Sequence, residues 1–306
     1  MDTRAEIREF LTTRRAKITP EQAGLPAGGS QRRVPGLRRE EVAVLAGVST
    51  DWYVRLEKGH IDGVSDDVLD AVARALQLDD AERTHLFNLA RAARPRRASR
   101  PRRTPRPVVR DSVQRILDSM SSAPAFVRNG RLDVLAINPL AEALYSPAYD
   151  HANGPVNLAR FCFLDPAARD LYPDWDDVAH STVAVLRAEA GRDPFSRELT
   201  DLVGELATRS DFFRTDWAAQ NVTLHQHGAK HFQHPVVGRI DVTFDSLDLP
   251  ADPGLTLTAY STEPGSPSAD ALALLASWNA TDAVSSSATA APSDMTVEHP
   301  AEQPGQ

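Results

Sequence analysis

Residues 39–59 have the sequence REEVAVLAGVSTDWYVRLEKG, which predicts two short helices joined by a tight corner. Apolar residues recur with helical spacing on one expected face of the first helix, formed by Val42, Ala43, Leu45 and Ala46. Gly47 supplies the backbone freedom that a sharp turn needs, and Ser49 is a favourable N-cap for a second helix starting near Thr50. This layout predicts a helix-turn-helix, the unit by which proteins insert a helix into DNA.

The second helix of this unit has a polar edge. Tyr53 and Leu56 lie three residues apart, so we expect both to face inward. Hydroxyl, carboxylate and guanidinium groups on the outward edge are able to read base edges in the major groove. The predicted DNA contacts of the two helices are Arg39, Ser49, Thr50, Asp51, Trp52, Arg55 and Lys58. An ordinary helical hairpin within a core is the alternative, but the turn, the cap and the polar edge all favour DNA binding.

The segment resembles the helix-turn-helix of the Xre or lambda-repressor-like class, in which Gly-Val-Ser precedes a Tyr-x-Arg-Leu-Glu-x-Gly ending, here residues 47–49 and 53–59. Further segments resemble MmyB-like transcription regulators, namely residues 25–26, 32–43, 132–138, 163–169, 172–175, 234–238 and 263–268. The resemblance extends from the first residues to near Trp278. It implies an Xre-type DNA-binding domain joined to a PAS-like ligand-binding domain.

The resemblance also implies roles for single residues. It assigns base contacts to Thr50, Asp51 and Arg55, and a phosphate or edge contact to Arg39. The fork of Arg55 can pair bidentately with O6 and N7 of guanine, which contributes about 1–3 kcal/mol of discrimination. Asp51 has three open roles: it accepts from cytosine N4, orients Arg55, or stabilises the helix N-terminus through the helix dipole. Glu57 matches a family position that pairs with an arginine of the first helix, here Arg14 or Arg15.

Arginines outside the two helices extend the expected DNA contacts. Three of them lie in or beside the long connection over residues 19–37, namely Arg32, Arg33 and Arg38. We expect these three to contact phosphates, with a solvated loop as the alternative. Residues 91–110 hold nine arginines and four prolines, which predicts an extended linker. Both a basic strap on DNA and a solvated hinge remain open for that linker.

The composition sets the outer bounds of the function. The chain of 306 residues is long enough for two domains, and its single cysteine, Cys162, excludes an internal disulfide framework. No apolar stretch approaches a bilayer span and residues 1–5 do not begin a signal peptide, so we expect a cytoplasmic protein without a membrane partner. Residues 1–110 hold 22 Lys and Arg against 15 Asp and Glu, whereas residues 111–306 hold 12 against 27. Only the basic first third is therefore expected to meet nucleic acid.

These patterns predict a multidomain chain. We expect an all-α, lambda-repressor-like helix-turn-helix domain over residues 1–94, a linker over 95–107, an α+β PAS-like domain over 108–279 and a disordered tail over 280–306. In the second domain, Asn129-Gly130 predicts a hairpin, and helices then precede further strands at 222–227, 231–237, 239–244 and 255–260. An antiparallel sheet of about five or six strands follows from this order.

A PAS-like sheet covered by helices implies an apolar space for a small molecule. The resemblance implies a fatty-acid-like or otherwise amphipathic ligand. The predicted pocket residues are Phe161, Phe163, Trp175, Leu186, Phe212, Phe213, Trp217 and Val222, with Arg214 for a ligand carboxylate. Simple core packing of the apolar residues is the alternative.

The four histidines His225, His227, His231 and His234 raise the possibility of zinc, but no cysteine pair accompanies them and no catalytic set emerges. We therefore expect neither a metal nor a cofactor, and no enzyme activity. The expected function is a transcriptional regulator that binds a double-stranded operator as a homodimer and responds to a small ligand. The alternative is a metal-binding or enzymatic second domain, with the first domain as a protein-interaction module.

Overall fold

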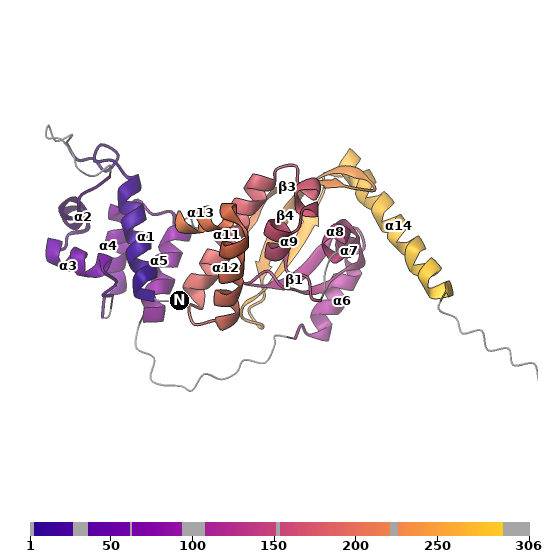
Figure 1. Ribbon diagram of the computed structural model, residues 1–306, viewed down its shortest axis with the longest axis horizontal. Coiled ribbons are helices and arrows are strands. Elements are labelled where there is room, and N and C mark those ends of the chain that lie inside the picture. The colour runs from indigo at the N-terminus through magenta and orange to yellow at the C-terminus, as the bar shows by residue number, and fades with distance from the viewer. Residues whose placement is uncertain are drawn as a thin grey trace, which may run out of the picture.

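The computed structural model describes residues 3–26, 36–61, 63–93, 108–150, 154–220 and 226–289, with side chains up to residue 279. Arg32, Arg33, Val222, His225 and the expected linker over 95–107 lie outside the described residues. Figure 1 shows a helical part at one end of the molecule and a part with helices around a sheet beside it.

The first part is an all-helical bundle, as the sequence predicts. Its helices are α1 (Thr3–Lys17), α2 (Arg39–Ala46), α3 (Thr50–Glu57), α4 (Asp66–Ala75) and α5 (Asp80–Ala93). Each helix has apolar residues at helical spacing, and these meet in one core that includes the fully buried Phe10, Tyr53 and Leu69.

The corner between α2 and α3 is built as its residues predict. Gly47 ends α2 in the left-handed conformation with a φ of 67°, and the hydroxyl of Ser49 accepts a hydrogen bond of 3.2 Å from the backbone N–H of Trp52. One detail differs from the expectation. Leu45 is 37% exposed, because the face of α2 that meets the core is formed by Val42, Ala43 and Ala46 alone.

The second part contains a five-stranded antiparallel sheet. Its strands are β1 (Ala125–Asn129), β2 (Val134–Ile137), β3 (His227–His234), β4 (Gly238–Asp248) and β5 (Leu255–Ser261). Their order across the sheet is β2-β1-β5-β4-β3, so the first hairpin and the last two strands meet through β5. This is the α+β arrangement that the sequence predicts.

The segment around Gly228 differs from the prediction. The sequence predicts one strand that ends at residue 227 and another that begins at residue 231, with Gly228 between them, but β3 runs without interruption from His227 to His234 and pairs with β4 along its whole length. Gly228 fits inside the strand because Phe244 of β4 packs against it: a Cβ there would lie 3.1 Å from the Phe244 ring.

Helices cover the sheet on both faces. The helices of the second part are α6 (Asp111–Ser119), α7 (Pro139–Leu144), α8 (Ser146–Asp150), α9 (Leu158–Leu164), α10 (Ala167–Leu171), α11 (Trp175–Arg192), α12 (Arg197–Arg209), α13 (Asp211–Ala218) and α14 (Pro267–Thr289). Strand alternation directs Ala125 and Val127 of β1 toward α6, and Phe126 toward the helices on the other face.

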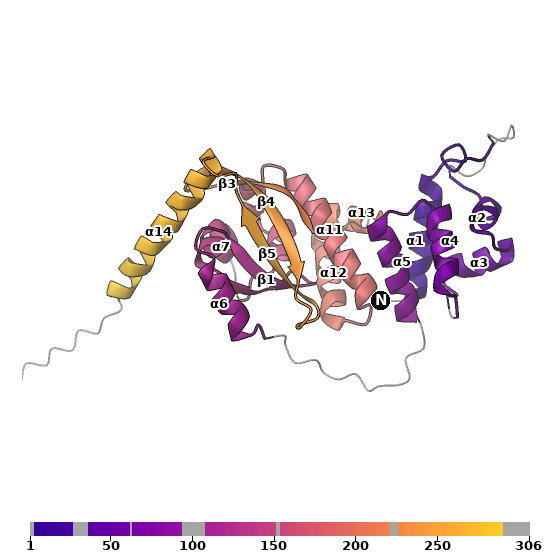
Figure 2. The same ribbon diagram turned by 180° about the vertical axis from the view of Figure 1, so that it is seen from behind.

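Helix α14 packs on α7 and β4 through Leu272 and Leu275, and then leaves the second part at the end remote from the helical bundle (Figure 2). It continues to Thr289, ten residues into the segment expected as a disordered tail. Alanine is the strongest helix former, and the alanines of this stretch favour continuation of the helix. Among the described residues, none of the helices has both the length and the apolar composition needed to cross a membrane.

Candidate DNA-binding surface and ligand cavity

Helix α3 lies at the end of the molecule away from the sheet, where both views leave its outer edge clear of the second part (Figures 1 and 2). The structure brings most of the predicted DNA contacts together on this edge. The exposed residues among them are Ser49, Thr50, Asp51, Arg55 and Lys58. Trp52 differs from these because it is half-buried and packs against the core of the bundle. An exposed edge with hydroxyl, carboxylate and cationic groups is suited to reading base edges.

A buried carboxylate fixes α3 to the two helices beside it. Glu57 of α3 is almost fully buried and accepts hydrogen bonds from Arg15 of α1 at 3.0 Å and from Arg39 of α2 at 3.1 Å. Burial alone would raise the pKa of Glu57, but the hydrogen bonds from Arg15 and Arg39 outweigh it and hold the pKa below its ordinary value. The structure thus selects Arg15 as the predicted partner of Glu57, whereas Arg14 pairs with Glu82 at 3.2 Å.

Two arginines at the start of α2 keep part of their surface in solvent. The side chain of Arg39 is 51% exposed although its guanidinium is held by Glu57, so a DNA phosphate would meet a fixed group. Arg38 precedes the helix, and its guanidinium lies 3.5 Å from the exposed Glu40. Its backbone N–H donates to the carboxylate of Glu41, which caps the helix.

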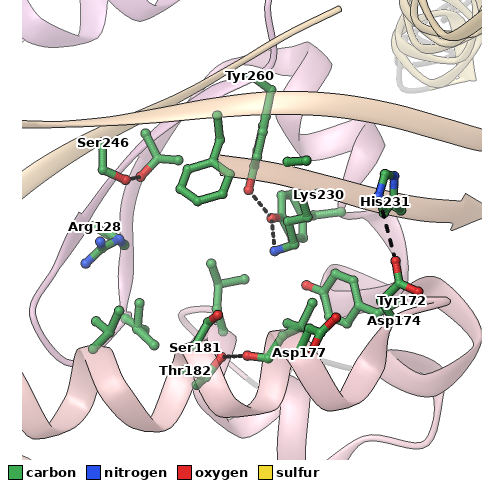
Figure 3. Close-up of a pocket in the computed structure, with 18 of the residues that line it drawn as sticks. Arg128, Tyr172, Asp174, Asp177, Ser181, Thr182, Lys230, His231, Ser246 and Tyr260 are labelled. Carbon is green, nitrogen blue, oxygen red and sulfur yellow. Dashed lines mark hydrogen bonds and ion pairs between the residues drawn. The ribbon is translucent and has the colours of Figure 1, made fainter. Parts of the chain in front are cut away.

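A cavity of about 330 Å³ lies between the sheet and α11 in the second part (Figure 3). Helix α11 contributes Asp177, Val178, Ser181, Thr182 and Val185 to its wall. The strands contribute Phe126, Arg128, Ala229, Lys230, His231, Phe244, Ser246, Thr258 and Tyr260. The wall thus combines apolar and aromatic side chains with polar and charged ones in similar number, which suits a ligand that has both an apolar and a polar part.

Lys230 is the central polar group of the cavity. Its amine donates a hydrogen bond of 3.2 Å to the hydroxyl of Tyr145, which lies 2.5 Å from the hydroxyl of Tyr260. The ammonium also lies 4.6 Å from the centre of the Tyr172 ring, a cation–π contact. Burial lowers the pKa of Lys230 to about 8, and the positive charge of Arg128 acts in the same direction.

The charges are distributed unevenly along the cavity. Arg128 lies at one end near Ser246, and Asp174 and His231 lie at the other end (Figure 3). His231 is held by Asp241 at 2.7 Å. Burial lowers the pKa of Arg128 as well. Neither Lys230 nor Arg128 forms an ion pair with a carboxylate among the described residues, so the cavity holds two cations that an anionic ligand would neutralise.

The predicted pocket residues lie elsewhere, and none of those described lines this cavity. Phe161, Trp175, Leu186 and Phe213 are buried in the hydrophobic cores, while Phe163, Phe212 and Trp217 pack at their edges. Arg214 is exposed and pairs with Asp211 at 2.8 Å. The physical reason is the orientation of α11. Its Trp175 and Leu186 face the neighbouring helices, where the ring centres of Phe163 and Phe213 lie 5.1 Å apart. The cavity lies on the side of α11 that faces the sheet.

Sequence reasoning missed Arg128, Lys230, Tyr145 and Tyr260. The strand order places Arg128, Lys230 and Tyr260 on one sheet, and Tyr145 reaches them from the end of α7, so only the tertiary fold brings the four together. One signal was available for Lys230. Strand alternation places it on the same face as the buried Phe232 and His234, and a charged residue on the core side of a strand is an indication of a site.

The histidines of β3 do not converge. His231 and His234 point to opposite faces of the strand, and His234 is buried with its Nε2 3.0 Å from the carbonyl oxygen of Ala143. In the part of the chain that the structure describes, no group of three or more His, Cys, Asp and Glu side chains is arranged to hold a metal ion.

Comparison with known proteins agrees with this division into two parts. The family model described as the MmyB-like transcription regulator ligand binding domain matches residues 109–275. The model described as a helix-turn-helix domain matches residues 7–86. A search of curated proteins found no match. The first range covers the part with the cavity, and the second covers the part with the exposed edge of α3.

Proposed function

The chain belongs to the MmyB-like transcription regulators, and we propose on this premise that it binds operator DNA through α3 and responds to a small amphipathic anion in the cavity. One observation carries the proposal: a helix-turn-helix with an exposed polar edge and a cavity with unpaired cations occur in one chain.

The DNA-binding part of the proposal concerns a defined set of side chains. Thr50, Asp51 and Arg55 are proposed to read base edges, while Ser49, Lys58, Arg38 and Arg39 are proposed to lie against the backbone of the duplex. Arg32 and Arg33 belong to this second group on the basis of sequence. The clamp on Glu57 supports this assignment, because it fixes the orientation of α3 relative to α2 and so presents the edge as a rigid unit. We propose that two copies bind a pseudo-palindromic operator, as helix-turn-helix dimers do.

The ligand part rests on charge and shape. A ligand with an acidic head and an apolar body would neutralise Lys230 and contact Phe126 and Phe244. A fatty acid fits this description. Burial removes the ammonium of Lys230 from water, and a carboxylate would accept charge-assisted hydrogen bonds from it in place of water. Regulation then follows if the ligand binds two arrangements of the protein with different affinity.

The experiment that tests the DNA-binding proposal is selection of sequences by the full chain. The purified protein is mixed with genomic fragments and random duplexes at moderate salt, with and without dodecanoate, and the bound fragments are sequenced. We expect enrichment of one sequence in at least one of the two conditions. Arg55→Ala should lower affinity for that sequence by about tenfold or more, because a bidentate arginine contact contributes roughly 1–3 kcal/mol.

Arg197→Ala is the matched control. It removes an arginine that is likewise exposed, from α12 of the second part, so operator affinity should stay unchanged. Equal enrichment of all fragments in both conditions would contradict specific binding. Undiminished affinity in Arg55→Ala would contradict the assignment of the reading edge.

A further inference from the structure

Helix α11 serves two different parts of the molecule. One side of it lines the cavity with Asp177, Ser181 and Val185. Another side meets the DNA-binding bundle: Ala188 packs against the core of that bundle, and α11 and α5 lie side by side in both views (Figures 1 and 2). The cavity and the interface between the two parts therefore share one helix.

Arg187 of α11 fastens this interface. Its side chain is fully buried, and its guanidinium donates a hydrogen bond of 3.1 Å to the carboxylate of Glu6 on α1. It also donates to the side chain of Gln220 at 2.6 Å and to the carbonyl oxygen of Trp217, whose ring lies 4.0 Å from the guanidinium carbon. A buried arginine with one carboxylate partner depends on the position of that partner.

A second connection crosses the same interface through Gln220. Arg14 of α1 donates to the backbone carbonyl of Gln220, and the side-chain amide of Gln220 donates to Glu9 of α1 at 3.1 Å. Gln220 is 1% exposed and has a φ of 57°, which a non-glycine residue rarely adopts. These polar connections require one particular alignment of α1 with the end of α13 and with α11.

The two parts also come close at Gly191. A Cβ atom at this position of α11 would lie 2.4 Å from Nδ1 of His85, a buried residue of α5. The absence of a side chain at residue 191 therefore lets α11 approach α5 closely. Because this contact leaves little free space, a movement of α11 toward α5 must displace α5 as well.

We propose that α11 transmits occupancy of the cavity to the docking of the DNA-binding bundle, with Arg187 as the positioning residue of that contact. A helix is rigid over a few turns and rises about 1.5 Å per residue. Ser181 and Arg187 are less than two turns apart, so a ligand that moves the cavity side also moves Arg187 relative to Glu6. Because the buried charges have partners in one alignment only, the contact has a docked and an undocked arrangement.

This inference rests on the proposed function for the class of ligand but not for the mechanical link. The test uses the full chain with nitroxide labels at Asp67→Cys on α4 and Glu142→Cys on α7, both exposed positions. The only natural cysteine, Cys162, is buried, which limits labelling to the two introduced sites. The distance between the labels is measured by pulsed electron paramagnetic resonance, with and without dodecanoate, whose binding is measured separately by calorimetry.

We expect dodecanoate to shift the distance distribution in the protein that retains Arg187. In Arg187→Met the distribution should be broad without dodecanoate and should not respond to it, while the affinity for dodecanoate stays within about twofold. Operator affinity should likewise lose its response to dodecanoate. Glu6→Gln removes the partner charge from α1 and should give the same result, which guards against a folding defect specific to one variant.

Arg192→Met is the matched control, because Arg192 is an exposed arginine on the same helix that pairs within the helix, with Glu189. It should keep both the narrow distribution and the response. If dodecanoate binds but the distribution is unchanged, or if Arg187→Met responds as fully as the protein with Arg187, the inference is overturned and the proposed function stands.

Failure of dodecanoate to bind would instead contradict the proposed ligand class. The link through α11 is then tested by Thr182→Trp, which fills the cavity from α11 itself. This variant should shift the distance between the two nitroxide labels. An unchanged distance would contradict the link through α11 whether or not any ligand binds.

Discussion

The carboxylate of Glu57 lies 3.1 Å from Nε of Arg39, which joins the last turn of α3 to the first turn of α2. Arg15 of α1 donates to the same carboxylate, so one buried anion holds three helices. The exposed edge of α3 owes its orientation to this group.

Glu57→Gln should destabilise the DNA-binding bundle by about 2–4 kcal/mol, because it leaves two arginines facing a neutral group in a buried place. The free energy of unfolding is measured by urea denaturation. Glu40→Gln, which alters an exposed carboxylate on α2, should change it by less than about 0.5 kcal/mol. Since the folded pKa of Glu57 is lowered, its stabilisation should be present at neutral pH and be lost as the pH falls below about 4. Equal stability of the two variants would contradict this account.

Lys230→Met should weaken dodecanoate binding by about tenfold or more, since a charge-assisted hydrogen bond contributes roughly 1.5–3 kcal/mol. Calorimetry measures the effect, and Arg197→Met serves as a cation-removing control outside the cavity. The pKa of Lys230 is about 8, so binding an anion above that pH requires uptake of a proton. Affinity should therefore decline as the pH rises above about 8 and be flat in Lys230→Met. A decline of equal steepness in both proteins would rule out Lys230 as its source.

Acid should destabilise the protein through His85. Burial, followed by the positive charges of Arg187 on α11 and Arg14 on α1, lowers the pKa of His85 to about 3. The folded state therefore keeps this histidine neutral while the unfolded chain protonates near pH 6.5, so the stabilisation is complete above about 6.5 and is lost as the pH falls toward 3. The loss should reach about 1.4 kcal/mol per pH unit in that window.

The measurement is the melting temperature between pH 7 and 5. In His85→Leu the decline over this range should be smaller than in the unaltered protein, and the exposed His60→Leu should leave it as it was. An identical decline in all three proteins would show that other groups are responsible.

Asn138→Ala should destabilise the second part by about 2–4 kcal/mol. The buried amide of Asn138 donates to the carbonyl oxygens of Met120 and Ala123 and accepts from the backbone N–H groups of Ala125 and Ala141. Its removal leaves several buried backbone groups without partners. Urea denaturation followed by circular dichroism measures the cost. Asn279 is half-buried, and among the described residues its side-chain amide has one hydrogen-bond partner, the carbonyl oxygen of Pro139, so Asn279→Ala should cost far less.

The parts of the structure that depend on neighbouring residues could be predicted from the sequence. The turn at Gly47 and the cap at Ser49 are local, and the hairpin around residue 130 follows from its own turn residues. The resemblance predicted that Glu57 meets an arginine of the first helix, and the structure selects Arg15. The resemblance did not indicate that Arg39 also binds Glu57.

The cavity could not be predicted in this way. Its cations come from β1 and β3, which lie on different sides of β5 in the sheet, and their proximity depends on the whole topology. The aromatic residues that were expected to line a pocket pack against one another instead, because contact between rings buries more apolar area than an open wall. The break expected between the strands at 222–227 and 231–237 was wrong for a related reason. Pairing with β4 overrides the local preference of Gly228 for a turn.

The double use of α11 has a consequence for how such a receptor diversifies. A substitution at Ser181 that lets the cavity accept a different molecule also perturbs the contact between α11 and the DNA-binding bundle. Changes on that helix therefore alter ligand preference and DNA binding together. Phe244 and Thr258 line the cavity from the sheet, so substitutions there change its shape without altering α11. Redesign of ligand preference should begin with those strands.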